Sequence, residues 1–115
     1  MIRGTTTQFI FKLPYPKGEL DWATMKFWQP GNPSPLLPIT RTLVDCDGEA
    51  ADFELCVSLT AEETERFSDK YRAKAQLRAK HSTSGIVFGC RPQVVPVYPM
   101  YDEILEDNID ELDEG

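Results

Sequence analysis

The chain has 115 residues, enough for one domain that buries a core of its own. Its formal net charge is −7 at pH 7, and the eight acids after Tyr101 account for this charge, because the residues before them hold eleven acids and twelve bases. The sequence shows no clustered excess of Lys and Arg, which DNA and RNA binding require, so we expect no nucleic acid partner.

The cysteines and the apolar segments exclude further classes of protein. Cys46, Cys56 and Cys90 are odd in number and lack C-x-x-C spacing, so they indicate neither a disulfide framework nor a zinc site. The opening MIRGTTTQFIFKLP lacks the apolar run of a signal peptide, and no apolar run in the chain is long enough to cross a bilayer. We therefore expect a soluble protein made in a cytosol, with reduced cysteines, no metal, no cofactor and no membrane partner.

Seven segments have the length and the β-forming residues of strands, several with strict alternation of apolar and polar residues. In chain order they are Thr7–Leu13, Thr24–Gln29, Leu36–Val44, Phe53–Leu59, Tyr71–His81, Ile86–Cys90 and Gln93–Tyr98. The clearest is YRAKAQLRAKH, from Tyr71, where apolar residues alternate with Arg, Lys and Gln. Its residue types also favour a helix, but on a helix the apolar ones would scatter around the cylinder. We therefore predict a strand with one buried and one solvated face.

The connections between these segments carry their own signals. PGNPSP, which follows Gln29, has three prolines and one glycine and predicts an irregular loop. Thr60 followed by Glu63 has the spacing of a capping box at the start of a short helical turn. Ser84 and Gly85 predict a turn that joins two strands as a hairpin.

DCDGE, from Asp45, resembles the start of a calcium-binding loop. The sixth position is Ala50, where the loop needs glycine, and the twelfth is Cys56, where it needs a glutamate. The match fails, so we expect a polar turn in which Gly48 has a positive φ.

These patterns together predict an all-β fold: a small antiparallel immunoglobulin-like sandwich of about seven strands with one short helical turn. The sandwich should occupy residues 1–100 and be followed by an acidic tail, residues 101–115.

Catalytic chemistry has little support in the sequence. His81 and Cys90 are the residues that could form a thiol–imidazole pair, but no local signature of an orienting group or an oxyanion site accompanies them. We expect His81 at a strand end and Cys90 in the partner strand, and we predict a protein that is not an enzyme.

Aromatic residues offer one candidate contact surface. Met25 and Phe27 share one face of the Thr24–Gln29 segment, so Trp28 is expected on the other face, beside the proline loop. Tryptophans in such half-buried strands usually belong to the core. If Trp22 and Trp28 are exposed instead, they would form a contact surface.

The acidic tail is the second candidate. Tyr101, Leu105, Ile109 and Leu112 have the spacing of one apolar helical stripe, with acids on the other faces. The segment is short, and its last acids oppose the helix dipole, so alone it should be marginal. Two interpretations stay open: a helix that orders on a basic, grooved partner, or a solvated tail.

Several motifs resemble a known family. The chain opens MIRGTT and FIFKLP, continues with VSLTAEET and AKAQLR, and has DEIL near its end. In these motifs it is similar to small structural proteins encoded in phages and prophages of Firmicutes, whose chains open MIRGTTP and carry VxLTQEET-like and QLR motifs. Thr7 stands where that family has proline, and the PGNPSP loop and the acids from Glu106 onward extend past its pattern.

This resemblance implies a virion or assembly protein, associated with the phage tail or baseplate, without catalytic residues. It implies a host-cytoplasmic location during assembly and then the virion. The expected partners are other phage structural proteins or further copies of the chain, reached through Trp28, the tail stripe, sheet edges and residues Ile2–Thr6, and no small-molecule ligand is expected. The alternatives are a module that binds host glycan or protein through its tryptophans, and an acidic inhibitor of a host protein.

Overall fold

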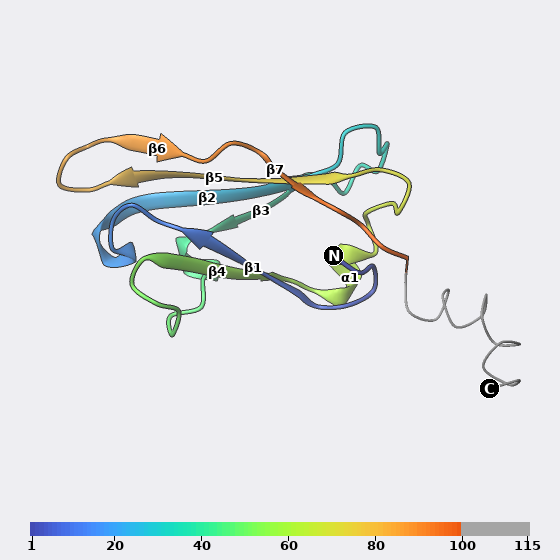
Figure 1. Ribbon diagram of the computed structural model, residues 1–115, viewed down its shortest axis with the longest axis horizontal. Helices are drawn as coiled ribbons and strands as arrows, with labels where there is room; N and C mark the ends of the chain where they lie inside the picture. Colours follow the sequence, from blue (N-terminus) through green and yellow to red (C-terminus); the bar gives the residue numbers. More distant parts are fainter. Residues whose placement is uncertain (100–115) are drawn as a thin grey trace, which may run out of the picture.

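The computed structural model describes residues 1–99, and the predicted tail stripe from Tyr101 to Leu112 lies outside them. The described residues form seven strands, one short helix, α1 (Ala61–Thr64), and two 3-10 turns, η1 (Lys17–Glu19) and η2 (Leu43–Asp45). Figure 1 shows the strands arranged in two layers. The strands are β1 (Thr7–Lys12), β2 (Leu20–Trp28), β3 (Ile39–Thr42), β4 (Glu54–Leu59), β5 (Ala73–His81), β6 (Val87–Gly89) and β7 (Gln93–Val95). The prediction of a small all-β domain is confirmed.

All strand pairs are antiparallel. β1 pairs with β4 in a two-stranded sheet, and the second sheet has the order β3-β2-β5-β6, with β7 also on β5. β6 and β7 lie along the same edge of β5, and Pro92, which has no N–H to donate to a ladder, lies in the gap between them. The finer immunoglobulin-like assignment is not confirmed by this strand order.

The core lies between the two sheets. β2 and β5 pair with Met25 opposite Leu77 and Phe27 opposite Ala75, and all four of these side chains are buried. The Phe27 ring lies 4.7 Å from the ring of Phe9 on β1, measured between centroids. Since β5 contributes mostly alanines to the buried face, the large rings of β1 and β2 fill the space above it.

β2 begins four residues before the predicted strand. Leu20 pairs with His81 and Trp22 with Lys80, so Asp21 is an extra residue and forms a β-bulge. The bulge separates the buried residues Leu20 and Ala23 by three positions, which hides the period of two in the sequence. The predicted strand Leu36–Val44 is shorter, because η2 follows β3, and the Asp45 carboxylate accepts a hydrogen bond from the Thr42 amide at 2.7 Å.

The predicted helical cap is confirmed. The Thr60 hydroxyl accepts from the Glu63 amide at 3.2 Å, and the Glu63 carboxylate accepts from the Thr60 amide at 2.8 Å. The predicted hairpin between β5 and β6 is also present, with Gly85 at φ 72°.

The prediction of a positive φ at Gly48 is wrong, because the three glycines with positive φ are Gly4, Gly31 and Gly85. The ammonium group of Lys17 donates to the carbonyls of Gly48 and Ala50 and holds the turn without that conformation.

The first residues of the chain pair within the same molecule. Ile2 bridges in parallel with Tyr98, and the amides of Arg3 and Tyr98 donate to the carbonyls of Tyr98 and Met1 at 3.1 and 2.8 Å. The buried Thr64 hydroxyl lies 2.9 Å from the Thr5 carbonyl and ties this segment to α1. We expected Ile2–Thr6 to pair with the sheet edge of a neighbouring subunit. In the structure, Ile2 pairs instead with Tyr98 of its own chain.

One buried amide holds the proline loop. The Gln29 side chain is 4 % exposed, and its nitrogen donates to the carbonyls of Ser68 and Tyr71 at 2.7 and 2.8 Å. Its oxygen accepts from the Ser68 amide at 2.8 Å and from the Asn32 side chain at 2.7 Å. A buried amide without hydrogen-bond partners costs free energy. This network therefore holds the loop that follows β2, through Asn32, against the loop that precedes β5, through Ser68 and Tyr71.

Arg41 on β3 forms an ion pair with Glu63, and both side chains are mostly buried. Burial alone would raise the pKa of Glu63, but the hydrogen bond from the Thr60 amide and the nearby Arg41 guanidinium outweigh it and lower this pKa. The pair joins β3 of one sheet to the start of α1.

Truncation of the central ring should destabilise the fold strongly. Phe27→Ala removes a fully buried ring and is expected to lower the free energy of unfolding by about 3–5 kcal/mol. Lys26→Ala, the adjacent exposed position, is expected to change it by less than about 0.5 kcal/mol. Urea denaturation of both variants checks this, and equal effects would contradict the assignment of the buried face.

The lowered pKa of Glu63 predicts a pH dependence. The carboxylate stabilises the fold above its unfolded pKa of about 4.3, and this contribution is lost as the pH falls through the lower folded value. Denaturation between pH 5 and the acid limit should therefore show a shallower loss of stability in Glu63→Gln than in the parent. Glu62→Gln, which changes an exposed carboxyl of the same helix, serves as the control; a Glu63→Gln slope equal to the parent's would contradict the shift.

Candidate functional site

The outward side of β2 and β5 is the candidate site, and we call it the outer face. Alternation places Trp22, Thr24, Lys26 and Trp28 of β2 on this side, together with Lys74, Gln76, Arg78 and Lys80 of β5. The core residues of both strands point the other way, toward the β1–β4 sheet. In the described part of the chain the outer face is therefore open.

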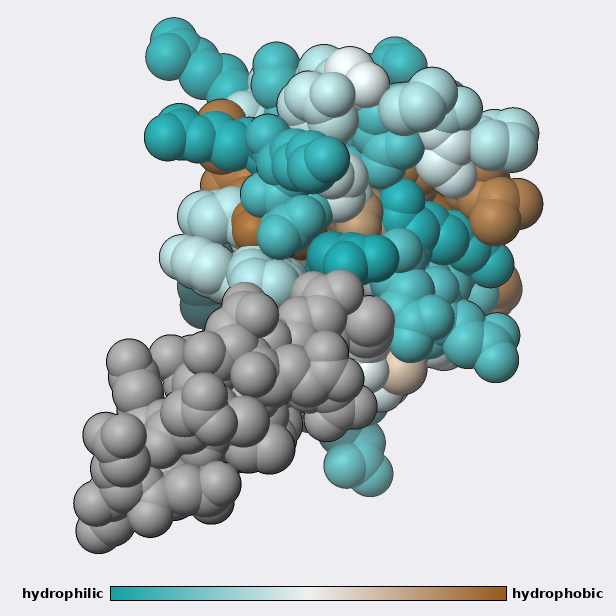
Figure 2. Space-filling view, turned by 90° about the vertical axis from the view of Figure 1, so that its right-hand side faces the viewer, coloured by the Kyte–Doolittle hydropathy of each residue, from teal (hydrophilic) through white to brown (hydrophobic). Residues whose placement is uncertain are grey.

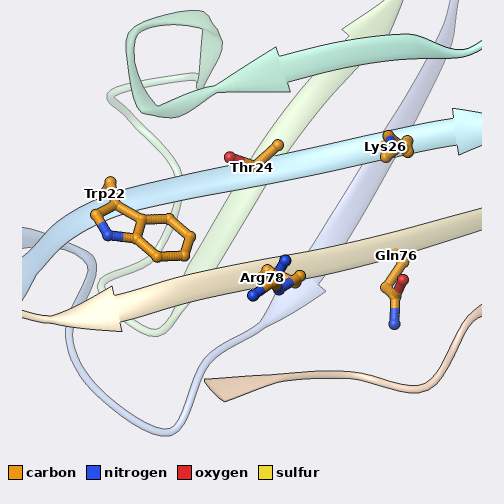
Figure 3. A pocket seen from close by; sticks show the side chains of 5 residues that line it. All are labelled: Trp22, Thr24, Lys26, Gln76 and Arg78. Carbon is orange, nitrogen blue, oxygen red and sulfur yellow. The ribbon is translucent and has the colours of Figure 1, made fainter. Parts of the chain in front are cut away.

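A groove runs along this face. One part has a volume of about 330 Å³ and is lined by the five side chains of Figure 3: Trp22, Thr24, Lys26, Gln76 and Arg78. A second part of about 350 Å³ is lined by Lys26, Trp28, Pro38 and Gln76. Because Lys26 and Gln76 line both parts, the two are adjacent, and the groove extends from Trp22 to Trp28.

The charges of the outer face are mostly positive. Lys26, Lys74, Arg78 and Lys80 contribute four cations, and Asp21 is the acid beside them, with its carboxylate 3.9 Å from the Lys80 ammonium. The Asp21 side chain is exposed and that of Lys80 is partly so, and 3.9 Å is a long separation, so the pair neutralises little of the local potential. A nearly neutral body thus carries one basic face.

Apolar side chains border this basic face. Trp22 is 36 % exposed and also lines a hollow of about 270 Å³ with Val44, which is 90 % exposed on η2. Val87 and Val94 on β6 and β7 stand opposite Lys80 and Lys74 and are half exposed. Figure 2 shows the end of the molecule that lies on the right in Figure 1. In this view, hydrophilic residues cover most of the coloured surface, and hydrophobic ones form separate patches at its two sides. The combination of cations and exposed apolar groups suits an acidic, partly apolar partner.

Part of this site is predictable from the sequence. Trp28 was predicted to point outward, and the structure places it there, half-buried at one end of the groove. Tyr101, Leu105, Ile109 and Leu112 lie outside the described residues.

Lys26, Gln76 and Arg78 were missed as a cluster, because they come from two strands separated by about fifty residues. The alternation of bases along β5 was the available signal, since one strand face that carries several cations is already a local excess of charge.

A second polar cluster surrounds His81 but serves the hairpin. The His81 ring stacks on Tyr15 at 3.9 Å between centroids, with Nε2 2.9 Å from the Glu19 carboxylate and Nδ1 2.7 Å from the Ser84 hydroxyl. The Ser84 amide also donates to Nδ1, so Nε2 carries the proton and donates to Glu19. Cys90 is engaged separately: its sulfur accepts from the Leu77 amide at 3.3 Å.

The other two thiols are poor nucleophiles at neutral pH. Burial raises the pKa of Cys46, and the charge of Asp45 adds to the shift; burial also raises the pKa of Cys56, with Asp47 and Glu54 contributing. Since the thiolate is the reactive form, these shifts keep both cysteines protonated.

Comparison with known proteins adds no assignment: no family model, no curated protein and no solved structure matches the chain. Among the helices of residues 1–99, none has the length and apolar character needed to span a bilayer.

The placement of both tryptophans on the outer face predicts that they are accessible to small quenchers. In Trp28→Phe, which retains Trp22, acrylamide should quench the fluorescence efficiently; in Trp22→Phe, quenching of the half-buried Trp28 should be weaker but measurable. Stern–Volmer titrations in dilute protein check this. Two fully protected tryptophans would contradict the open groove.

Proposed function

We propose that this chain is a non-enzymatic phage virion or assembly protein, associated with the tail or baseplate, that contacts other subunits through its outer face and its acidic end. The observation that carries the proposal is the open, basic groove that extends from Trp22 to Trp28. The resemblance of MIRGTT, VSLTAEET and QLR to small phage structural proteins supports the phage setting. The protein would reside in the host cytoplasm during assembly and then in the virion.

The composition of the groove favours a macromolecular partner. Tryptophan and arginine are the residues that most often dominate the binding energy of protein interfaces, and the outer face offers Trp22, Trp28 and Arg78 on two rigid strands. The groove lies along the outward face of a sheet and has two parts side by side, whereas sites for small molecules are single concavities that enclose most of the ligand. A neighbouring subunit fits this geometry better than a metabolite.

The tryptophans also favour a second candidate, recognition of a host glycan. Sugar rings stack on exposed indoles, and Thr24 and Gln76 lie between Trp22 and Trp28 as hydrogen-bonding groups. The two functions differ in what they require. Glycan binding should be lost in Trp22→Ala and survive charge reversal at Arg78, whereas subunit contact should be sensitive to both.

Particle composition tests the proposal. Quantitative mass spectrometry of phage particles from a producing host should find the chain at a fixed small copy number relative to the major capsid subunit. The double variant Lys26→Glu with Arg78→Glu, which reverses the basic face, should lower incorporation at least about tenfold.

Lys12→Gln is the control, since Lys12 lies on the other sheet and loses only a solvent-exposed ion pair with Glu54. Absence of the chain from particles, together with normal particle assembly in the double variant, would overturn the proposal.

A further inference from the structure

We propose that the outer face is the docking site for the acidic tail, residues 101–115, of another copy of this chain. The inference rests on the proposed function and names the partner of the same face. The partner of the outer face is thus a second copy of the same chain, whose acidic tail contacts this face.

Charge complementarity is the first argument. The outer face has four cations and one acid, whereas the segment from Asp102 to the last residue has eight carboxylates and no base. The carboxylates of the acidic segment are therefore opposite in sign to the cations of the outer face. A nucleic acid would have to compete with these tethered carboxylates and approach a chain of net charge −7.

Apolar content and length are the second argument. The groove ends at Trp22 and Trp28, six residues apart on β2, which corresponds to roughly 20 Å along a strand. The stripe from Tyr101 to Leu112 would extend about 17 Å at the rise of a helix, the spacing that the sequence predicts. Acids beside the stripe would then meet Lys26 and Arg78 while the apolar side chains meet the indoles.

The exit of the chain favours a second copy over the molecule's own face. Val97 is buried and Tyr98 pairs with Ile2, so the described chain ends beside the N-terminal residues, near α1, on the side of the sheet that carries the core. Asp102 follows Pro99 by three residues, which span roughly 10 Å when extended, about the thickness of one packed layer. Part of the acidic run would therefore have to pass around the sheet edge to reach the molecule's own outer face, whereas the face of another copy can contact the whole run.

Such a contact joins two different surfaces of the same protein. Contacts of this heterologous kind produce rings when the rotation between copies closes and open chains when it does not. The single chain of 13.1 kDa is then the repeating unit, and each copy uses its face for one neighbour and its acidic segment for the next.

Sedimentation of the full chain and two complementary variants tests the proposal. The face variant, Lys26→Glu with Arg78→Glu, retains the acidic segment, and the segment variant, with the eight carboxylates of residues 102–114 changed to amides, retains the face. The parent should associate as its concentration rises at about 0.05 M salt and dissociate at about 0.5 M, because salt screens the contact. Each variant alone should be monomeric, and a 1:1 mixture should form a heterodimer.

The controls separate the possible failures. Lys12→Gln should associate like the parent, and circular dichroism should show that both variants remain folded. A mixture that stays monomeric, with Trp fluorescence of the parent dependent on its own segment, would overturn the proposal in favour of docking within one chain. Binding of a single-stranded oligonucleotide by the parent, but not by the face variant, would overturn it in favour of nucleic acid.

Normal incorporation of the chain into particles despite a monomeric parent would refute this inference alone. Absence from particles would refute the proposed function itself.

Discussion

The pairing of β2 with β5 is the constraint on which the other features depend. It is the longest strand pair of the described fold, and from Ala23 opposite Ala79 to Trp28 opposite Lys74 it runs without a break in register. A shift of β2 by one residue against β5 would turn Phe27 to solvent and Lys26 into the core. The core and the outer face are therefore two consequences of one alignment.

Packing shows how that alignment is enforced. β5 buries Ala73, Ala75 and Ala79, which are too small to fill the space between the sheets, and the aromatic rings of β1 and β2 fill it instead. The Phe27 ring contacts the ring of Phe9 from the opposite sheet, so the layers interlock around one side chain. The Gln29 amide and the Arg41–Glu63 pair then fix the loops and α1 to this core.

Much of the fold was accessible from the sequence because its signals are local. The alternation in β5, the capping box at Thr60 and the turn at Gly85 each depend on residues a few positions apart, and the structure contains all three. β2 was placed too late, because the bulge at Asp21 breaks the period that defines a strand. The Gly48 turn was misjudged, because the bonds that hold it come from Lys17, about thirty residues away.

The candidate site was less accessible for the same reason. Trp28 was placed on the surface by its spacing from Phe27, but its neighbours Gln76 and Pro38 belong to other parts of the chain. Net charge was informative about the acidic end and misleading about the body, because acids elsewhere in the body conceal the four cations of one sheet face when all residues are summed. Strand registers, which a single sequence does not give, are what bring those cations together.

The alanine row of β5 also has an evolutionary consequence. These buried positions contribute little side chain, so the strand's place in the sheet depends on its backbone pairing and on rings supplied by other strands. Its outward positions are then under weak structural restraint, since a surface substitution in a strand seldom changes stability by more than about 0.5 kcal/mol. Lys74, Gln76, Arg78 and Lys80 can diverge while the scaffold persists, so a few substitutions on one strand can change the charge and shape of the outer face.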